Sequence, residues 1–283
     1  MRARCAACLA LLLALRLHAA AAAADTMRVE IEPGRQAEVA ITPEGRVQVR
    51  FLPGDAMQVL QAPVEDWDGQ VALGHDDYDF DGRQDLVLSA TLGQVNLANV
   101  VYRFDPARQR FGLLEVPTNA PTSCEGFWAL LPDAATRTLT SSCRGGPMWY
   151  TDVYRYTDDG QLYVYQSQQL LEQLAFPPLE LPSDDQDDAL PLSRWTTYDA
   201  HGRVLHRFLG QTPQAGATAT VAVSEMALYD APRAGRARRM LRAGERVELL
   251  DLDDGGTWLQ VRHGGPGRAA ISGWLRLDPL QTP

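Results

Sequence analysis

The stretch "VALGHDDYDFDGRQDLVLSATL", residues 71–92, places an acidic loop between two apolar segments. Alternate residues of a tight loop can all point inward, and calcium takes six to eight oxygen ligands at about 2.3 to 2.6 Å. Gly82 stands at position 6, where the loop needs a sharp turn, and the backbone carbonyl of Arg83 can fill a further place. The spacing therefore predicts calcium as the cofactor. The four carboxylates, at positions 1, 3, 5 and 9, are those of Asp77, Asp79, Asp81 and Asp85.

A turn that is acidic by chance is the alternative to a calcium site. Four aspartates in register with a glycine favour the ion, because without a cation the carboxylates would repel one another. The helix-loop-helix calcium hand is excluded, since its position 12 needs a bidentate glutamate and that place is Leu88. The sequence favours a structural ion that stabilises the turn over an ion with a functional role.

Short segments with period-two alternation and turn residues continue on both sides of this loop. Examples are "EVAITPEGRVQVRFLP" (38–53), "VVYRFDPARQRFGLL" (100–114) and "DVYRYTDDGQLYVYQSQ" (152–168). Such a pattern predicts a mainly β protein built from antiparallel hairpins. The one stretch that could form a helix is "QSQQLLEQLA" (166–175), which Pro177 would end.

Residues 1–24 have the pattern of a secretory signal peptide, with Arg2 and Arg4 before an apolar run and small residues at its end. Arg16 and His18 interrupt this run, so it is not expected to span a membrane. We therefore expect an exported, periplasmic protein without a membrane span. The leader holds three of the 26 basic residues and none of the 36 acidic ones. The remainder is strongly acidic, which argues against nucleic acid as a partner.

Cys124 and Cys143 are the two cysteines that follow the leader, and they predict one disulfide in an exported chain. Closing a loop of this length stabilises a fold by on the order of 3 kcal/mol. A metal site is the weaker alternative, because no CxxC motif or nearby histidine accompanies either thiol.

The segment "RGGPMWY" (144–150) follows the second cysteine. Its glycines and proline predict a loop of fixed shape that ends in large side chains, and Arg, Trp and Tyr dominate the energetics of protein interfaces. We therefore take Arg144, Trp149 and Tyr150 as candidate partner-binding residues. The alternative is that Trp149 and Tyr150 are core residues at the start of the next strand.

Composition divides the chain into two predicted domains. A β-rich calcium-loop domain (25–210) is followed by a small-residue linker (211–219) and a C-terminal module (220–283). Before the linker lies a proline-rich acidic loop that we interpret as a solvated loop and not as a second metal site. Its aspartates are Asp184, Asp185, Asp187 and Asp188.

The loop pattern DxDxDGxxDL resembles the calcium loops of FG-GAP repeats in integrin α chains and in exported bacterial proteins. Over residues 45–210 the series "DYDFDGRQDLVL", "VVYRFDPARQRF", "SSCRGGPMWYTDVYRY" and "GQLYVYQ" is similar to a family of exported β-rich bacterial proteins. Its members include periplasmic immunity proteins that inhibit lysozyme-like effectors of an antibacterial type IV secretion system. The resemblance implies an inhibitor that pushes a loop into the cleft of a glycosidase.

The C-terminal module resembles the bacterial SH3-type β-barrel through "LYDAP", "GERVELLD", "WLQVR" and "GWL". The resemblance implies that the module binds peptidoglycan, with Tyr229 and Trp258 lining a groove, or that it is a spacer in which both are core residues. Five arginines from Arg233 to Arg242 make a basic patch or a solvated loop. The residues expected to point into the barrel are Val247, Leu249, Leu259, Val261, Trp274 and Leu275.

No catalytic constellation stands out. The motifs HExxH, GxSxG and SxxK are absent, and both cysteines of the exported chain are expected to be oxidised. We therefore expect a protein that is not an enzyme. Two functions remain: an inhibitor or immunity protein that binds a peptidoglycan hydrolase or lysozyme-like effector, and a non-inhibitory protein that binds the cell wall through the SH3-like module.

Overall fold

The computed structural model describes residues 26–42, 46–60, 71–93, 95–171, 176–181, 192–264 and 269–277. These residues form strands and turns and contain no helix, and every strand pair is antiparallel, so the predicted mainly β fold is confirmed. Within the described ranges no helix is long and apolar enough to cross a membrane. The predicted signal peptide and the four aspartates of the proline-rich loop, Asp184, Asp185, Asp187 and Asp188, lie outside them.

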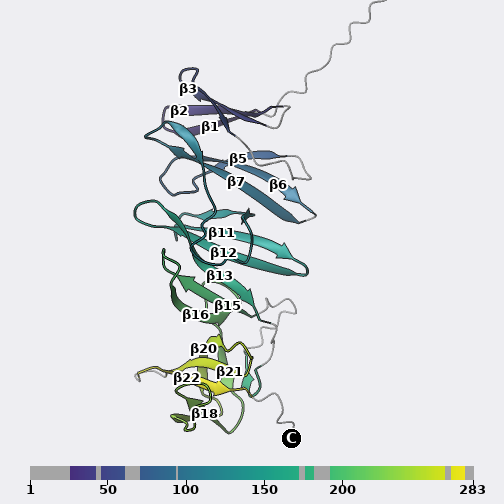
Figure 1. The fold of residues 1–283 in the computed structure, drawn as a ribbon, viewed down its shortest axis with the longest axis vertical. Coiled ribbons are helices and arrows are strands. Elements are labelled where there is room, and N and C mark those ends of the chain that lie inside the picture. Colours follow the sequence, from purple (N-terminus) through teal and green to yellow (C-terminus); the bar gives the residue numbers. More distant parts are fainter. Residues whose placement is uncertain are drawn as a thin grey trace, which may run out of the picture.

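Four antiparallel sheets follow one another along the long axis of the molecule in chain order (Figure 1). The first sheet is a meander in which short turns join neighbouring strands, and each strand alternates buried and exposed side chains. Its strands are β1 (Thr26–Glu32), β2 (Arg35–Ile41), β3 (Val47–Leu52) and β4 (Met57–Leu60).

The second sheet carries the acidic loop, which connects its first two strands. Its order is β5-β6-β7-β8, and the short β9 pairs with β7. The strands are β5 (Ala72–Asp76), β6 (Asp85–Leu92), β7 (Asn96–Asp105), β8 (Arg110–Leu113) and β9 (Phe127–Trp128).

The third sheet has six strands in the order β10-β11-β12-β13-β15-β16. The disulfide between Cys124 and Cys143 joins the segment before β9 to β11, and this confirms the predicted pairing. The strands are β10 (Leu131–Asp133), β11 (Thr138–Gly145), β12 (Met148–Tyr156), β13 (Leu162–Leu170), β15 (Ser193–Tyr198) and β16 (Val204–Gly210).

The fourth sheet has seven strands in the order β14-β17-β20-β21-β22-β18-β19 and forms the C-terminal end of the molecule (Figure 1). The strands are β14 (Leu179–Glu180), β17 (Thr218–Val221), β18 (Glu225–Tyr229), β19 (Arg239–Arg242), β20 (Arg246–Leu252), β21 (Trp258–His263) and β22 (Ile271–Arg276).

The second sheet is buried on both faces. Leu86 and Leu88 of β6 pack with the first sheet, whereas Val87 packs with Leu139 and Tyr154 of the third sheet. Successive residues of a strand point to opposite faces, which explains why this segment reads as a continuous apolar run. The loop between β5 and β6 is therefore held at a junction of three sheets.

The apolar cluster of the fourth sheet contains residues from both sides of the predicted linker. Phe176, Leu179, Leu192 and Leu209 pack with the C-terminal strands, and β14 pairs with β17. The C-terminal core thus draws on chain that the sequence places in the first predicted domain.

Two sequence-based expectations about local structure are wrong. Residues Gln166–Leu170 continue strand β13 and form no helix, because β13 pairs with β12 on one side and β15 on the other. Trp274 is only half-buried, since it alternates with Gly273 and Leu275, which face the core. The other five expected barrel residues are buried: Val247, Leu249, Leu259, Val261 and Leu275.

Candidate metal centre

The acidic loop is closed by hydrogen bonds from its own backbone. The carboxylate of Asp77 accepts the N–H of Asp81 at 3.1 Å and the N–H of Gly82 at 2.9 Å. Gly82 has a φ of 86°, a conformation that glycine adopts without steric cost. Gly82 thus allows the sharp turn that its position predicts, and Asp77 closes this turn through its backbone hydrogen bonds.

Asp85 anchors the other end of the loop in the core. It is the first residue of β6 and only 1% exposed, and its Oδ2 accepts the N–H of Tyr78 at 3.0 Å. Its Oδ1 accepts the N–H of Phe104 on β7 at 2.8 Å. The carboxylate is therefore positioned by two separate segments of backbone.

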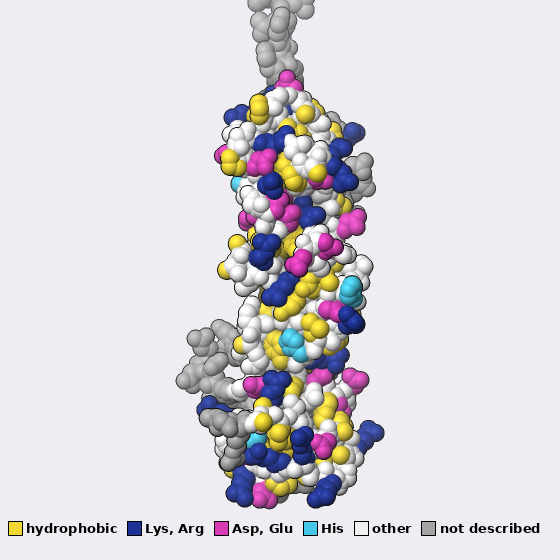
Figure 2. All heavy atoms as spheres, turned by 90° about the vertical axis from the view of Figure 1, so that its left-hand side faces the viewer, with side chains coloured by type: hydrophobic (Ala, Val, Ile, Leu, Met, Phe, Trp, Pro, Cys, Tyr) yellow, Lys and Arg dark blue, Asp and Glu magenta, His cyan; other side chains and the backbone are white. Residues whose placement is uncertain are grey.

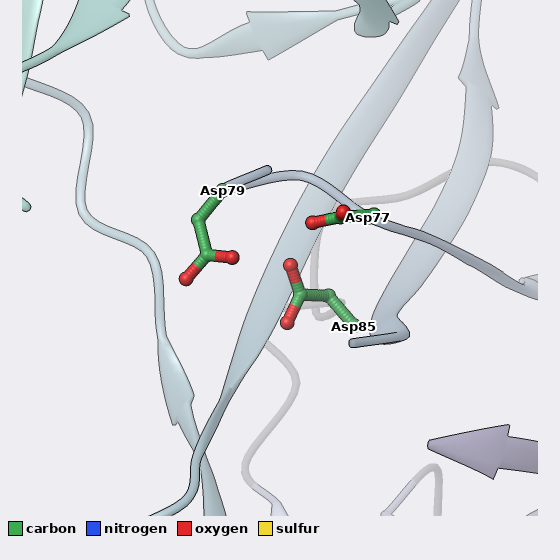
Figure 3. Close-up of side chains that lie close together, drawn as sticks. All are labelled: Asp77, Asp79 and Asp85. Atoms are coloured by element: carbon green, nitrogen blue, oxygen red, sulfur yellow. The ribbon is translucent and has the colours of Figure 1, made fainter. Parts of the chain in front are cut away.

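Three carboxylates meet on one side of the loop (Figure 3). One oxygen from each of Asp77, Asp79 and Asp85 lies within 4.8 Å of the others. Oδ1 of Asp79 is buried without a hydrogen-bond partner, and Oδ2 lies 3.5 Å from Nη1 of Arg103. A buried polar atom without a partner is costly, and a cation among these oxygens would satisfy it. The residues present fit a hard divalent ion such as calcium.

The electrostatics of the group also favour a cation. Burial, followed by the charge of Asp81, raises the pKa of Asp79 to about 6. Burial, followed by the charge of Asp79, raises the pKa of Asp85 to about 8. Both causes penalise the ionised carboxylates, and an opposite charge close by would offset that penalty.

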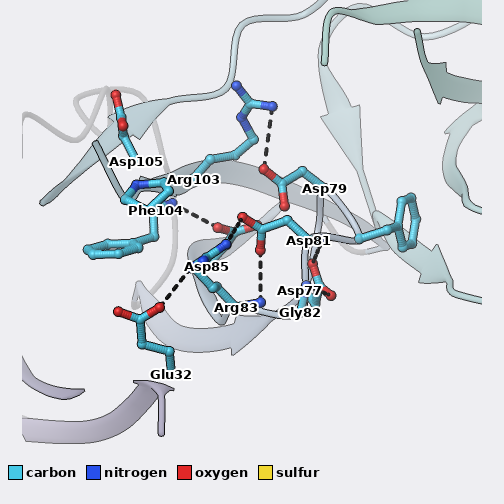
Figure 4. A network of polar contacts seen from close by, with 12 residues as sticks. Glu32, Asp77, Asp79, Asp81, Gly82, Arg83, Asp85, Arg103, Phe104 and Asp105 are labelled. Atoms are coloured by element: carbon cyan, nitrogen blue, oxygen red, sulfur yellow. Dashed lines mark hydrogen bonds and ion pairs between the residues drawn. The ribbon is translucent and has the colours of Figure 1, made fainter. Parts of the chain in front are cut away.

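The fourth predicted carboxylate is not part of this group of three and is held by Arg83 instead. Asp81 accepts the N–H of Arg83 at 2.8 Å and pairs with its guanidinium at 3.0 Å. Arg83 also donates to Glu32 of β1 at 2.8 Å (Figure 4). The structure thus brings three of the four predicted carboxylates together. The role of Asp81 and of the Arg83 carbonyl as ligands stays a prediction.

Arg103 and Glu32 are the site neighbours that the sequence pattern missed. They lie 18 residues after Asp85 and 45 residues before Asp77, on strands whose pairing the sequence does not specify. No spacing signal could have found them, because they reach the loop through the packing of sheets.

The predicted partner-binding residues lie at the tip of the β11–β12 hairpin and not in a free loop. Arg144 pairs with Trp149 across the two strands, and Gly146-Pro147 makes a two-residue turn with a φ of 60° at Gly146. The backbone of Arg144 exchanges hydrogen bonds of 2.7 and 3.0 Å with the side chain of Asn96. The tip is therefore braced against β7.

Trp149 is 48% exposed, so it is a surface residue and not part of the core. Tyr150 is half-buried, and its ring lies over Gly145, where an added Cβ would come within 3.0 Å of it. The aromatic side chains are thus presented on opposite sides of one short strand end.

The predicted wall-binding aromatics line a hollow of about 750 Å³ in the C-terminal sheet. The rings of Tyr229 and Trp258 meet edge to face, with centroids 5.5 Å apart. Trp258 is largely buried, so Tyr229 contributes more of the open surface. Basic side chains gather at this end of the molecule (Figure 2), although Arg238 pairs with Asp230 and Arg239 with Glu245.

Comparisons of the chain with protein-family models, curated proteins and solved structures give no match. The resemblances to FG-GAP calcium loops, to exported immunity proteins and to SH3-type barrels therefore depend on the motifs quoted above.

Proposed function

We propose that the protein is an exported, periplasmic calcium-binding protein that binds and inhibits a peptidoglycan hydrolase and is not itself an enzyme. The observation that carries the inhibitory part is the β11–β12 hairpin, which presents the exposed ring of Trp149 on a braced tip. A rigid aromatic tip binds at a low cost in conformational entropy. The hydrolase cleft is the concave partner that the family resemblance implies.

Calcium is the ion that we assign to Asp77, Asp79 and Asp85. The partnerless oxygen of Asp79 and the all-oxygen donor set support this choice over a softer metal. The ion would supply positive charge that holds the carboxylates together. Because the loop also contacts β1 through Gln84 and Arg83, the expected role of the ion is structural.

The inhibitory function is tested by following the lysis of a peptidoglycan suspension through its turbidity. A panel of lysozyme-type hydrolases is assayed with a stoichiometric amount of the mature protein. We expect at least one hydrolase to be inhibited and Trp149→Ala to lose most of that inhibition, since Trp anchors dominate interface energies.

Leu205→Ala is the matched control for this experiment, because Leu205 is 60% exposed but lies on β16 at the edge of the same sheet. It should inhibit like the wild type. If Trp149→Ala inhibits as well as the control, the hairpin tip is not the inhibitory element. If no hydrolase is inhibited, the inhibitor proposal fails.

A non-inhibitory wall-binding protein is the second candidate, and the hollow around Tyr229 is the observation that favours it. The hollow also contains Arg233, Asp253 and Thr257, so it offers both charges and an aromatic wall. Peptidoglycan stem peptides carry carboxylates and amines that such a wall can bind. Sedimentation with purified sacculi should pull down the wild type and leave Tyr229→Ala in the supernatant, and a wild type that stays soluble excludes this candidate.

A further inference from the structure

Arg103 is the cationic neighbour of the three-carboxylate group. Its Nη1 lies 3.5 Å from Oδ2 of Asp79 and donates to the carbonyl of Gly160 at 3.4 Å. Its guanidinium also lies over the ring of Tyr156, 5.5 Å from the centroid. Gly160 and Tyr156 therefore help to hold the positive charge of Arg103 beside Asp79. Figure 4 shows the contact between Arg103 and Asp79.

The three carboxylates are neutralised unequally. Asp77 and Asp85 accept backbone N–H groups, which carry only partial charges, whereas Asp79 faces a full charge on Arg103. Arg103 and Asp79 also line a hollow of about 380 Å³ that opens beside the loop. An ion that approaches Asp79 through this hollow passes Arg103.

We propose that Arg103 is an internal counter-ion that stabilises the metal-free loop and lowers its affinity for calcium. This inference rests on the proposed calcium site. The guanidinium attracts the Asp79 carboxylate when no metal is bound, and it repels a divalent cation that shares this carboxylate. A guanidinium that only oriented Asp79 toward the ion would have the opposite effect and would raise affinity.

Terbium luminescence measures binding without any enzymatic assay, because Tyr78 lies in the loop and the ring of Tyr156 lies beside Arg103, where both can sensitise a bound lanthanide. Calcium is titrated against bound terbium to give its Kd in the full mature chain. We expect Arg103→Gln to bind calcium about tenfold more tightly than the wild type. A charge at this distance changes the ionisation constant of a carboxyl group by about tenfold or more, and we expect a similar effect on calcium binding. Arg103→Lys keeps the charge and should stay near the wild-type Kd.

Arg108→Gln is the matched control, since Arg108 lines the same hollow but pairs with Asp105. Its calcium affinity should be unchanged. The melting temperature adds a second readout. In chelator, Arg103→Gln should melt at a lower temperature than the wild type, and with calcium bound the two proteins should melt at the same temperature.

Weaker calcium binding by both Arg103→Gln and Arg103→Lys would make Arg103 a positioning residue and overturn the proposal. An unchanged Kd for Arg103→Gln would also overturn it. If the wild type binds neither terbium nor calcium, the metal site itself is wrong, and the inference about Arg103 is wrong with it. This result differs from one in which the wild type binds calcium and Arg103→Gln binds it equally well, because the second result contradicts only the role of Arg103.

Discussion

At the scale of single residues, Asp152 is a fully buried carboxylate that accepts hydrogen bonds from the backbone. Its oxygens accept the N–H groups of Ser123 and Cys124 at 2.9 Å. We expect Asp152→Asn to lower the free energy of unfolding by about 1–3 kcal/mol, because the new amide N–H₂ group would face a backbone N–H. Urea unfolding of the two proteins measures the difference.

Asp158→Asn is the control for this substitution, since Asp158 is exposed in the turn between β12 and β13. Its unfolding midpoint should match the wild type. An Asp152→Asn variant with the same midpoint as this control would show that the buried acceptor is not needed.

At the scale of elements, the disulfide ties the segment before β9 to β11, the strand that leads into the Trp149 hairpin. Reduction, or Cys143→Ser, should lower the free energy of unfolding by on the order of 3 kcal/mol, because the closed loop limits the entropy of the unfolded chain. Urea unfolding with and without reductant measures this effect. Two free thiols in the denatured, unreduced protein would contradict the pairing in solution.

A second element-scale prediction concerns the pH dependence of the first sheet. Glu38 on β2 lies between Arg28 of β1 and Arg50 of β3, and hydrogen bonds from Arg50, then Arg28, lower its pKa. A lowered pKa in the folded state adds stability above the usual value of 4.5, and this stability is lost as pH falls through the lowered pKa.

The wild type should therefore be more stable than Glu38→Gln at neutral pH, and the difference should vanish in acid. Thermal unfolding from pH 7 to pH 2 checks this at low salt, since screening weakens exposed pairs. Glu30→Gln, an exposed change on β1, should show no such pH dependence relative to the wild type.

At the scale of the whole molecule, the acidic loop between β5 and β6 lies where three sheets meet. Gln84 donates to the backbone of β1, and Arg137, from the turn before β11, donates to the carbonyl of Phe80. Calcium at a hundredfold excess over its Kd should raise the free energy of unfolding by about 2.7 kcal/mol. Calcium should therefore also raise the melting temperature, and Asp79→Ala combined with Asp81→Ala should abolish this rise.

Differential scanning calorimetry in calcium and in chelator measures this rise, with Asp158→Ala as a control that keeps it. Identical curves in calcium and chelator for the wild type would rule out the metal site.

The C-terminal core gives a second prediction at this scale. Phe176 is 1% exposed and packs with Leu249 and Leu259, although it precedes the predicted module by more than forty residues. Phe176→Ala should destabilise the C-terminal sheet by about 3–5 kcal/mol. Native-state hydrogen exchange of the amides of Leu249 and Leu259 reports this locally, and unchanged protection would show that the two parts are energetically separate.

The loop and the disulfide could be predicted from the sequence because their determinants are local. Asp77, Gly82 and Asp85 lie within nine residues, so their spacing alone fixes which groups can meet. The sequence indicates the hairpin tip less well: it identifies Arg144, Trp149 and Tyr150 but predicts a free loop where two paired strands run to the turn. The helix prediction for residues 166–175 is wrong over Gln166–Leu170, because strand pairing overrides local propensity there.

The sequence by itself determined the β class, the acidic loop and the cysteine pair, since alternation, turn residues and short-range spacing act over a few residues. Only the tertiary structure decided that Arg103 faces Asp79, that Asp81 turns to Arg83, and that Phe176 joins the C-terminal core. These contacts join residues on different strands and sheets. Which of them form depends on the register and stacking of whole sheets, and no local pattern encodes that arrangement.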